Sequence, residues 1–267
     1  MAARASQTLA VAFPSHEPYP LTGALELAIA ESLASGASRP ERVTRVLGTV
    51  FRRISGQGAT PSRVRCLTSG AREWLLQRAA GLFWADTGWF QAKCVRCDAD
   101  YDVPTVLARA PRKPAGAGFP VVTVHTSLGP RTFEVPNGLH EEQLARSPGS
   151  DPVRTLLAHC GLSERAGSDA QDFTADDVAR IEAALEEVSP EVADEVVTAC
   201  PSCRAETRAR IDPLAFAFPG LTTLLREVHA IAATYHWAED AILALPSHRR
   251  RGYARLARAA PTGGARR

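Results

Sequence analysis

The chain has 267 residues, of which 45% are hydrophobic, and its formal net charge at pH 7 is +2. That length and composition suit one large or two small domains with a substantial core. The near-neutral charge gives no general argument for binding nucleic acid. No run of about 18 apolar residues predicts a membrane-spanning helix. Residues 1–20 lack a signal-peptide pattern, so we expect a flexible leader and a cytoplasmic protein without a membrane partner.

Apolar residues recur every three or four positions in three segments before residue 89, and this spacing predicts helices. Pro40 suits the first turn of the second helix. In the third helix, Trp74 and Leu75 are expected to face inward. A segment rich in Gly and Ser separates the second helix from the third. The expected N-terminal helical unit is residues 21–88, with helices over 22–34, 39–54 and 68–83 and a loop over 55–62.

The pattern of polar and apolar residues changes around two Cys-x-x-Cys pairs. After the first pair, Tyr101 and Val103 alternate with aspartates, which predicts a strand, a tight turn and a second strand over residues 89–106. Residues 194–218 repeat this pattern around the second pair. Two such turns facing each other bring four thiolates together, as a structural Zn²⁺ site requires. The expected ligands are Cys94, Cys97, Cys200 and Cys203.

Two other interpretations of the cysteine pairs are weaker. A redox pair of the thioredoxin type precedes a helix, whose N-terminus lowers the thiol pKa, whereas alternating strand residues follow both pairs here. Four unrelated buried thiols would not share one pattern. Zinc-binding turns usually carry Gly after the second Cys, but Asp98 and Arg204 stand there, which leaves open how firmly the metal is retained. Cys66 and Cys160 are interpreted as structural thiols, although His159 precedes Cys160.

Residues 107–193 are predicted to be an insertion between the two halves of a split zinc ribbon. The insertion begins with a linker rich in Pro and Gly over 107–120 and continues with a hairpin over 121–136. Helices follow, and Thr174 is the expected N-cap of the last of them. A metal that joins the two halves would close this long excursion of the chain, where the entropy cost of closure is large.

A long amphipathic helix is predicted over residues 219–237, with an apolar stripe that can pack on the ribbon and reach beyond it. Two shorter helices complete a C-terminal segment over 219–260, and residues 261–267 are expected to be disordered. Aromatic and Arg side chains dominate many protein interfaces, although here they can equally close a small helical core or contact phosphates. The expected partner-binding residues are Trp237, Arg249, Arg250, Arg251 and Tyr253.

The stretches "ACPSCRAETRARIDPLAF" and "LLREVHAIAATYHWAEDAILALPSHRRRGYARL" combine a zinc-type CxxC, an "IDPLAF"-like segment, a "REVHxIAxxYHW" helix and an "E/DxILxLPxxRRxxY" segment. This combination resembles a family encoded with contractile phage tails and phage-tail-like injection systems, whose members are described as baseplate hub or hub-assembly chaperone proteins. The segments "LTSGAREWLLQRA" and "CVRCDADYDV" also fit, so the resemblance covers residues 65–260, loosely in the middle. The matching C-terminal residues are Glu227, His229, Tyr235, His236, Trp237, Ile242, Leu243, Leu245, Arg249, Arg250 and Tyr253.

The resemblance implies a non-enzymatic role in building a contractile machine, through contacts with baseplate, spike or tube proteins. The residues agree in one respect: no Gly-rich phosphate loop and no Ser/His/Asp constellation predicts a catalytic centre or a small-molecule substrate. A zinc-ribbon protein that binds nucleic acid or acts as a regulator is the alternative. The expected fold class is α+β, mainly helical, with a small split zinc-ribbon β unit and a C-terminal helical segment.

Overall fold

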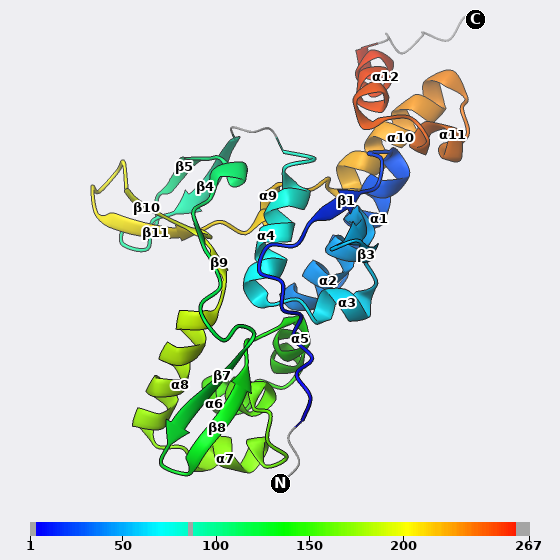
Figure 1. The fold of residues 1–267 in the computed structure, drawn as a ribbon. Coiled ribbons are helices and arrows are strands. Elements are labelled where there is room, and N and C mark those ends of the chain that lie inside the picture. The colour runs from blue at the N-terminus through cyan, green and yellow to red at the C-terminus, as the bar shows by residue number, and fades with distance from the viewer. Residues whose placement is uncertain (1–3, 85–87, 260–267) are drawn as a thin grey trace, which may run out of the picture.

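The computed structural model describes residues 4–84 and 88–259, and it confirms an α+β fold that is mainly helical. Figure 1 shows four parts: an N-terminal helical unit, a ribbon of two hairpins, a lobe inserted between those hairpins, and a C-terminal helical lobe. The inserted lobe and the C-terminal lobe lie at opposite ends of the molecule. The sequence-predicted tail, 261–267, lies outside the described residues.

The N-terminal unit packs its helices around one apolar core. Thr22, Ser38, Thr60 and Thr68 precede the four helices, and Thr22, Thr60 and Thr68 accept hydrogen bonds from backbone N–H groups of the first turn. Ile29, Leu47, Leu75 and other apolar side chains fill the core. The helices are α1 (Gly23–Ala34), α2 (Arg39–Val50), α3 (Pro61–Arg65) and α4 (Ser69–Ala80).

A small sheet interrupts the helical unit and corrects the prediction for residues 51–54. The helix expected to run through residue 54 ends at Val50, and strand β2 (Phe51–Ile54) follows. Ser55 and Gly56 both have positive φ, at 51° and 73°, so they form the tight turn that a twisted hairpin requires. This turn pairs β2 with β3 (Gln57–Gly58), where the sequence indicated only a loop.

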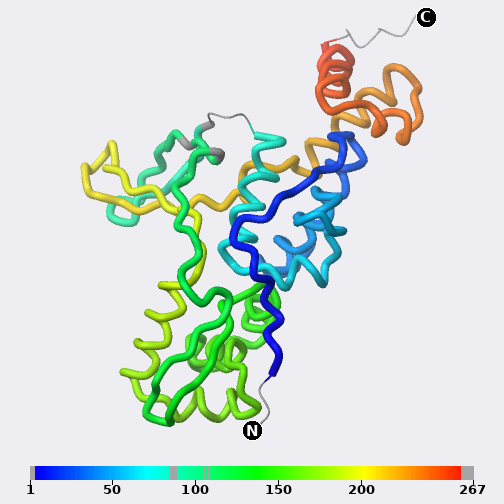
Figure 2. Tube along the Cα trace, viewed as in Figure 1, coloured from blue at the N-terminus to red at the C-terminus, as the bar shows by residue number. Residues whose placement is uncertain are grey.

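The first twenty residues are not a flexible leader over the part that is described. Strand β1 (His16–Pro18) pairs with β2, and the ring of Phe13 packs against Trp74. Further toward the N-terminus, the backbone N–H of Leu9 donates to the carbonyl of Cys66, and that of Arg4 donates to the carbonyl of Leu162. Figure 2 shows this segment running from the helical unit down to the inserted lobe.

The ribbon consists of two antiparallel hairpins that come from distant parts of the chain. Strand β4 (Gly88–Lys93) pairs with β5 (Asp100–Thr105), and β10 (Glu195–Ala199) pairs with β11 (Glu206–Arg210). Phe90, Tyr101 and Ala209 belong to their shared core, which also receives Phe216 from α9 (Pro213–Phe216). The hydroxyls of Tyr101 and Thr207 hydrogen-bond at 2.6 Å across the two hairpins.

The inserted lobe contains the predicted hairpin and four helices. Val124 and Phe133 of the hairpin pack on Leu157 and Ile181 of the helices, and Thr174 caps the last helix as expected. The elements are β7 (Val121–Thr126), β8 (Gly129–Glu134), α5 (Gly138–Arg146), α6 (Pro152–Cys160), α7 (Ala166–Asp172) and α8 (Ala175–Val188). The connections to the ribbon carry a 3₁₀ turn, Leu107–Arg109, and the short pair β6 (Arg112–Lys113) and β9 (Glu191–Val192).

The C-terminal lobe is formed by α10 (Leu221–Tyr235), α11 (Glu239–Leu243) and α12 (Ser247–Ala259). The apolar stripe of α10 packs chiefly on α1, α11 and α12, whereas the sequence indicated packing on the ribbon. Packing of this stripe therefore holds the C-terminal lobe against α1, the first helix of the chain.

A buried ion-pair network holds this junction and corrects the expectation that Arg250 is exposed. Arg250 is 1% exposed, and its guanidinium contacts the carboxylates of Glu26 on α1 and Glu227 on α10. Gly23 makes room for it, because a Cβ at that position would meet the guanidinium at 2.6 Å. Arg250 is therefore a folding residue of this lobe and is not available to a partner.

Replacing Arg250 by Ala should destabilise the protein strongly, because Glu26 is as deeply buried and would lose its main partner. Breaking a buried pair from one side costs about 3 kcal/mol or more. The exposed neighbour Arg249 is the matched control, and Arg249→Ala should change the free energy of unfolding by less than about 0.5 kcal/mol. Urea unfolding measures both, and equal midpoints for the two variants would contradict the buried network.

Candidate metal centre

The four cysteines that the sequence paired meet at the ends of the two hairpins. The Sγ atoms of Cys94 and Cys203 are 3.7 Å apart, those of Cys97 and Cys200 are also 3.7 Å apart, and all four lie within 4.8 Å of one another. An ion bound about 2.3 Å from four tetrahedral sulfurs separates those sulfurs by about 3.8 Å. The cluster therefore has the size and donor set of a four-thiolate metal site.

Each Cys-x-x-Cys turn has the same backbone geometry. The N–H of Asp98 donates to the carbonyl of Cys94 at 2.9 Å, and the N–H of Arg204 donates to the carbonyl of Cys200 at 2.8 Å. Asp98 and Arg204 have φ of 61° and 59°, in the left-handed region that Gly occupies most easily. The turns thus form without the usual Gly, at a backbone cost of about 1 kcal/mol or more each. Asp tolerates this region better than Arg.

The protonation of the cluster shows why a cation suits it. The backbone N–H of Cys203, helped by that of Ser202, lowers the pKa of the Cys200 thiol to about 6 against the effect of burial. At Cys97 the backbone N–H of Ala99 favours the thiolate, but the neighbouring thiols outweigh it and raise the pKa to about 12. Four thiolates this close repel one another. A bound metal ion compensates that charge and allows all four to lose their protons.

The arrangement supports a structural role for the metal and not a catalytic one. Each cysteine pair lies in a turn between two strands and not at the start of a helix, so the geometry that lowers the pKa of a thioredoxin-type thiol is missing from both turns. Four protein thiolates complete a tetrahedral coordination sphere, and no position remains for water or substrate. A metal held by these four thiolates would join the two hairpins.

A second cluster, in the inserted lobe, was missed by the sequence analysis. The Sγ of Cys160 lies 3.5 Å from Nδ1 of His140, and Nε2 of His140 lies 3.1 Å from Glu134. The adjacent His159, considered from the sequence, is not the partner. Cys160 is fully buried, and burial raises the pKa of its thiol, so the group is a poor nucleophile. Only the fold brings His140 to Cys160, so local spacing contains no signal for this contact.

Glu134 of this cluster anchors the N-terminal segment. The hydroxyl of Ser6 and the backbone N–H groups of Gln7 and Thr8 donate to one carboxylate oxygen, each at 2.8 Å. Burial alone would raise the pKa of Glu134, but hydrogen bonds from His140, Thr8 and Ser6 outweigh it and lower the pKa to about 2. The cluster is therefore a buried polar anchor.

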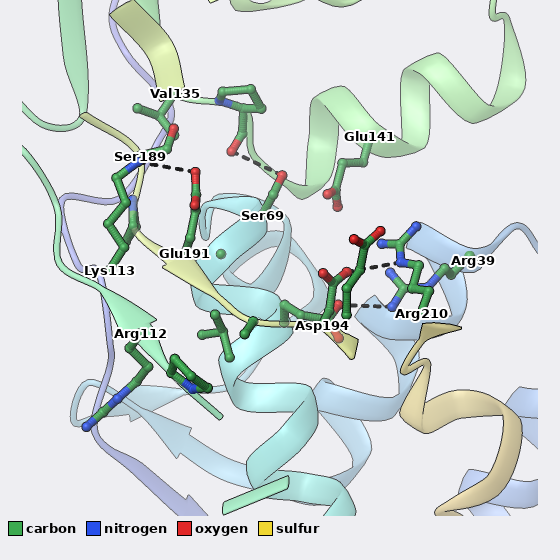
Figure 3. Close-up of a pocket in the computed structure, with 18 of the residues that line it drawn as sticks. Arg39, Ser69, Arg112, Lys113, Val135, Glu141, Ser189, Glu191, Asp194 and Arg210 are labelled. Atoms are coloured by element: carbon green, nitrogen blue, oxygen red, sulfur yellow. Dashed lines mark hydrogen bonds and ion pairs between the residues drawn. The ribbon is translucent and has the colours of Figure 1, made fainter. Parts of the chain in front are cut away.

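A crevice of about 800 Å³ lies between the N-terminal unit, the inserted lobe and the ribbon. Figure 3 shows its charged side chains, most of which pair with one another. Arg39 on α2 lies 2.9 Å from Glu73 and 3.1 Å from Asp212, and Arg210 lies 3.0 Å from Asp194. Because cationic and anionic side chains alternate and largely pair in its lining, neither sign of charge dominates the crevice.

The structure separates the five predicted partner-binding residues. Trp237 is 37% exposed, and its ring packs against Tyr235 and Tyr253. Arg249 is exposed, whereas Arg251 is bound to Glu26 and Arg250 is buried. The three consecutive arginines, all expected to bind a partner, thus lie in three different environments.

No protein-family model, no curated protein and no solved structure matches this chain. Within residues 4–84 and 88–259, none of the helices has the length and apolar content needed to cross a bilayer.

The metal site makes a direct prediction about stability. Replacing Cys94 by Ser removes one ligand and should lower the melting temperature by about 5 °C or more, the shift that a loss of about 2 kcal/mol causes in a chain of this size. Cys66→Ser is the matched control, because Cys66 is outside the cluster. Differential scanning calorimetry on metal-loaded protein measures both, and equal effects would argue against a bound metal.

The Glu134 anchor predicts a dependence of stability on pH. Its folded-state pKa is about 2, below the unfolded reference of 4.5, so its contribution is complete above pH 4.5 and is lost as the pH falls toward 2. That loss amounts to roughly 3 kcal/mol. In Glu134→Gln the free energy of unfolding should fall less steeply over this range, whereas exposed Glu195→Gln should behave as wild type. Identical pH profiles for all three proteins would refute the anchor.

Proposed function

We propose that this chain is a non-enzymatic assembly or structural protein of the baseplate or hub of a contractile, phage-tail-like injection machine. The observation that carries the proposal is that the residues of the C-terminal family pattern pack together. Although they are spread over residues 227–253, they meet in one helical lobe. A sequence pattern that specifies a packed lobe with an exposed aromatic edge fits a protein-binding module better than a catalytic one.

Two sets of contacts show this convergence. Glu227 and Arg250 pair with each other in the buried ion-pair network, and Arg250 also pairs with Glu26 on α1. Tyr235, Trp237 and Tyr253 pack their rings together with centroids 5.0–5.9 Å apart. Trp237, at the edge of this aromatic cluster, stays partly exposed. It supplies the kind of large, rigid side chain that anchors protein interfaces.

We also propose that the metal is Zn²⁺. The donor set of four thiolates in tetrahedral arrangement is that of structural zinc sites, whereas magnesium and calcium require oxygen ligands. A structural zinc would leave the protein without a catalytic metal, in keeping with a non-enzymatic role. The protein would act in the cytoplasm, where such particles assemble, and through contacts with baseplate, spike or tube proteins.

The alternative of a nucleic-acid-binding protein gains little from the three consecutive arginines. Of the three consecutive arginines, only Arg249 is exposed and without a carboxylate partner among the described residues. A duplex-binding protein needs several free cations to neutralise phosphates. Steeply salt-dependent binding to DNA by the purified protein would nevertheless support this alternative.

The proposal is tested in cells that produce the particle. Deleting the gene should abolish assembled contractile particles in electron micrographs, and the wild-type gene should restore them. Arg249→Glu should fail to restore them, because it reverses an exposed charge one helical turn before Tyr253, whose ring packs on Trp237. The change should not disturb the start of α12, where a carboxylate is favourable. Arg208→Glu, an exposed change on the ribbon, should restore them.

Particles at the wild-type level without the gene would contradict the proposed function. Full restoration by Arg249→Glu in an otherwise required gene would show that this arginine is not a contact.

A further inference from the structure

The outer side of α10 and α12 carries an apolar groove with a cationic border. The groove measures about 500 Å³ and is lined by Thr222, Leu225, Arg226, His229, Ala230 and Arg258. Leu225 is 46% exposed, although it belongs to the apolar stripe of α10 by sequence. An exposed Leu in a hollow between two helices is a typical anchor point for a third helix.

The charge of this surface is one-sided. Helix α12 contains five arginines and no acidic residue, and the only carboxylate of α10, Glu227, is bound to Arg250. Arg226 and Arg258 are exposed, and neither pairs with a carboxylate in the part of the chain that the structure describes. The groove therefore favours an occupant with negative charge around a small apolar centre.

The same chain offers a matching surface on α8. Glu182 and Glu186 are exposed one turn apart, and Ala179 and Ala183 are exposed beside them at the same spacing. Neither glutamate side chain pairs with a cation among the described residues. Small alanines let a helix approach another closely, and the carboxylates that lie along one side of the alanines can reach arginines that border a groove.

The two surfaces cannot meet within one molecule. Figure 1 places α8 along one side of the inserted lobe, and α10 and α12 at the opposite end of the protein. A contact between them must therefore join two copies. Because the surfaces differ and lie at opposite ends, a head-to-tail row of copies uses both surfaces of each copy. Repeated head-to-tail contacts generate rings or filaments.

We propose that copies of this chain associate head-to-tail, with the acidic face of α8 from one copy in the groove between α10 and α12 of the next. Ala179 and Ala183 pack toward Leu225, and Glu182 and Glu186 pair with Arg226 and Arg258. This association depends only on shape and charge and does not require the proposed role in a contractile machine.

Sedimentation velocity on the purified full chain tests the proposal. At low salt the mass should exceed the 28.6 kDa of one chain and rise with protein concentration, and at about 0.5 M salt it should fall to one chain because exposed charges are screened. Two neutralised variants identify the surfaces: Arg226→Gln with Arg258→Gln, and Glu182→Gln with Glu186→Gln. Each alone should weaken self-association at least about tenfold with an unchanged melting temperature.

Mixing the two variants gives the sharpest result. Each retains one intact surface, so the mixture should form a 1:1 complex that grows no further. Arg208→Gln on the ribbon is the control and should associate as wild type. A wild-type protein that stays monomeric at low salt, variants that associate normally, or a mixture that stays monomeric would each overturn the proposal. Loss of duplex-DNA binding in the arginine variant of a monomeric protein would assign the groove to nucleic acid instead.

Discussion

The contact between the two cysteine turns is the constraint on which the rest of the structure depends. Cys97 and Cys200 lie 3.7 Å apart although the whole inserted lobe separates them in the chain. Closing so long a segment costs chain entropy, and the shared ribbon core and the hydroxyl pair across the hairpins offset that cost. A metal bound by all four thiolates would add to this stabilisation and would fix where the inserted lobe leaves and returns.

Buried and half-buried polar contacts then set the positions of the other parts. Arg39 connects α2 to Glu73 and to Asp212 beyond the ribbon, Glu134 holds the N-terminal segment against the inserted lobe, and Arg250 connects the last helix to the first. Such groups are costly to bury unless their partners are in place. Each of them therefore specifies one arrangement of two parts of the chain that lie far apart in sequence.

The features that could be predicted from the sequence are those that depend on residues close together in the chain. The two Cys-x-x-Cys turns and the N-cap Thr174 follow from residues a few positions apart. The burial of Arg250 could not be predicted, because its partner Glu26 lies at the other end of the chain, and Cys160 likewise meets His140 only through the fold. The Ser55-Gly56 turn is encoded locally, but the spacing of Phe51 and Ile54 also suits a helix, so the sequence alone does not distinguish the strand from a helical turn.

The measurement that tests the account most directly is X-ray absorption at the zinc K-edge, on protein produced with zinc and never exposed to a chelator. The account predicts about one zinc per chain, surrounded by four sulfurs at about 2.3 Å and by no nitrogen or oxygen. Cys203→Ser should lose the ion or replace one sulfur by oxygen. Protein that folds fully with no bound metal, or with fewer than four sulfur ligands, would contradict the claim that the metal joins the two halves of the ribbon.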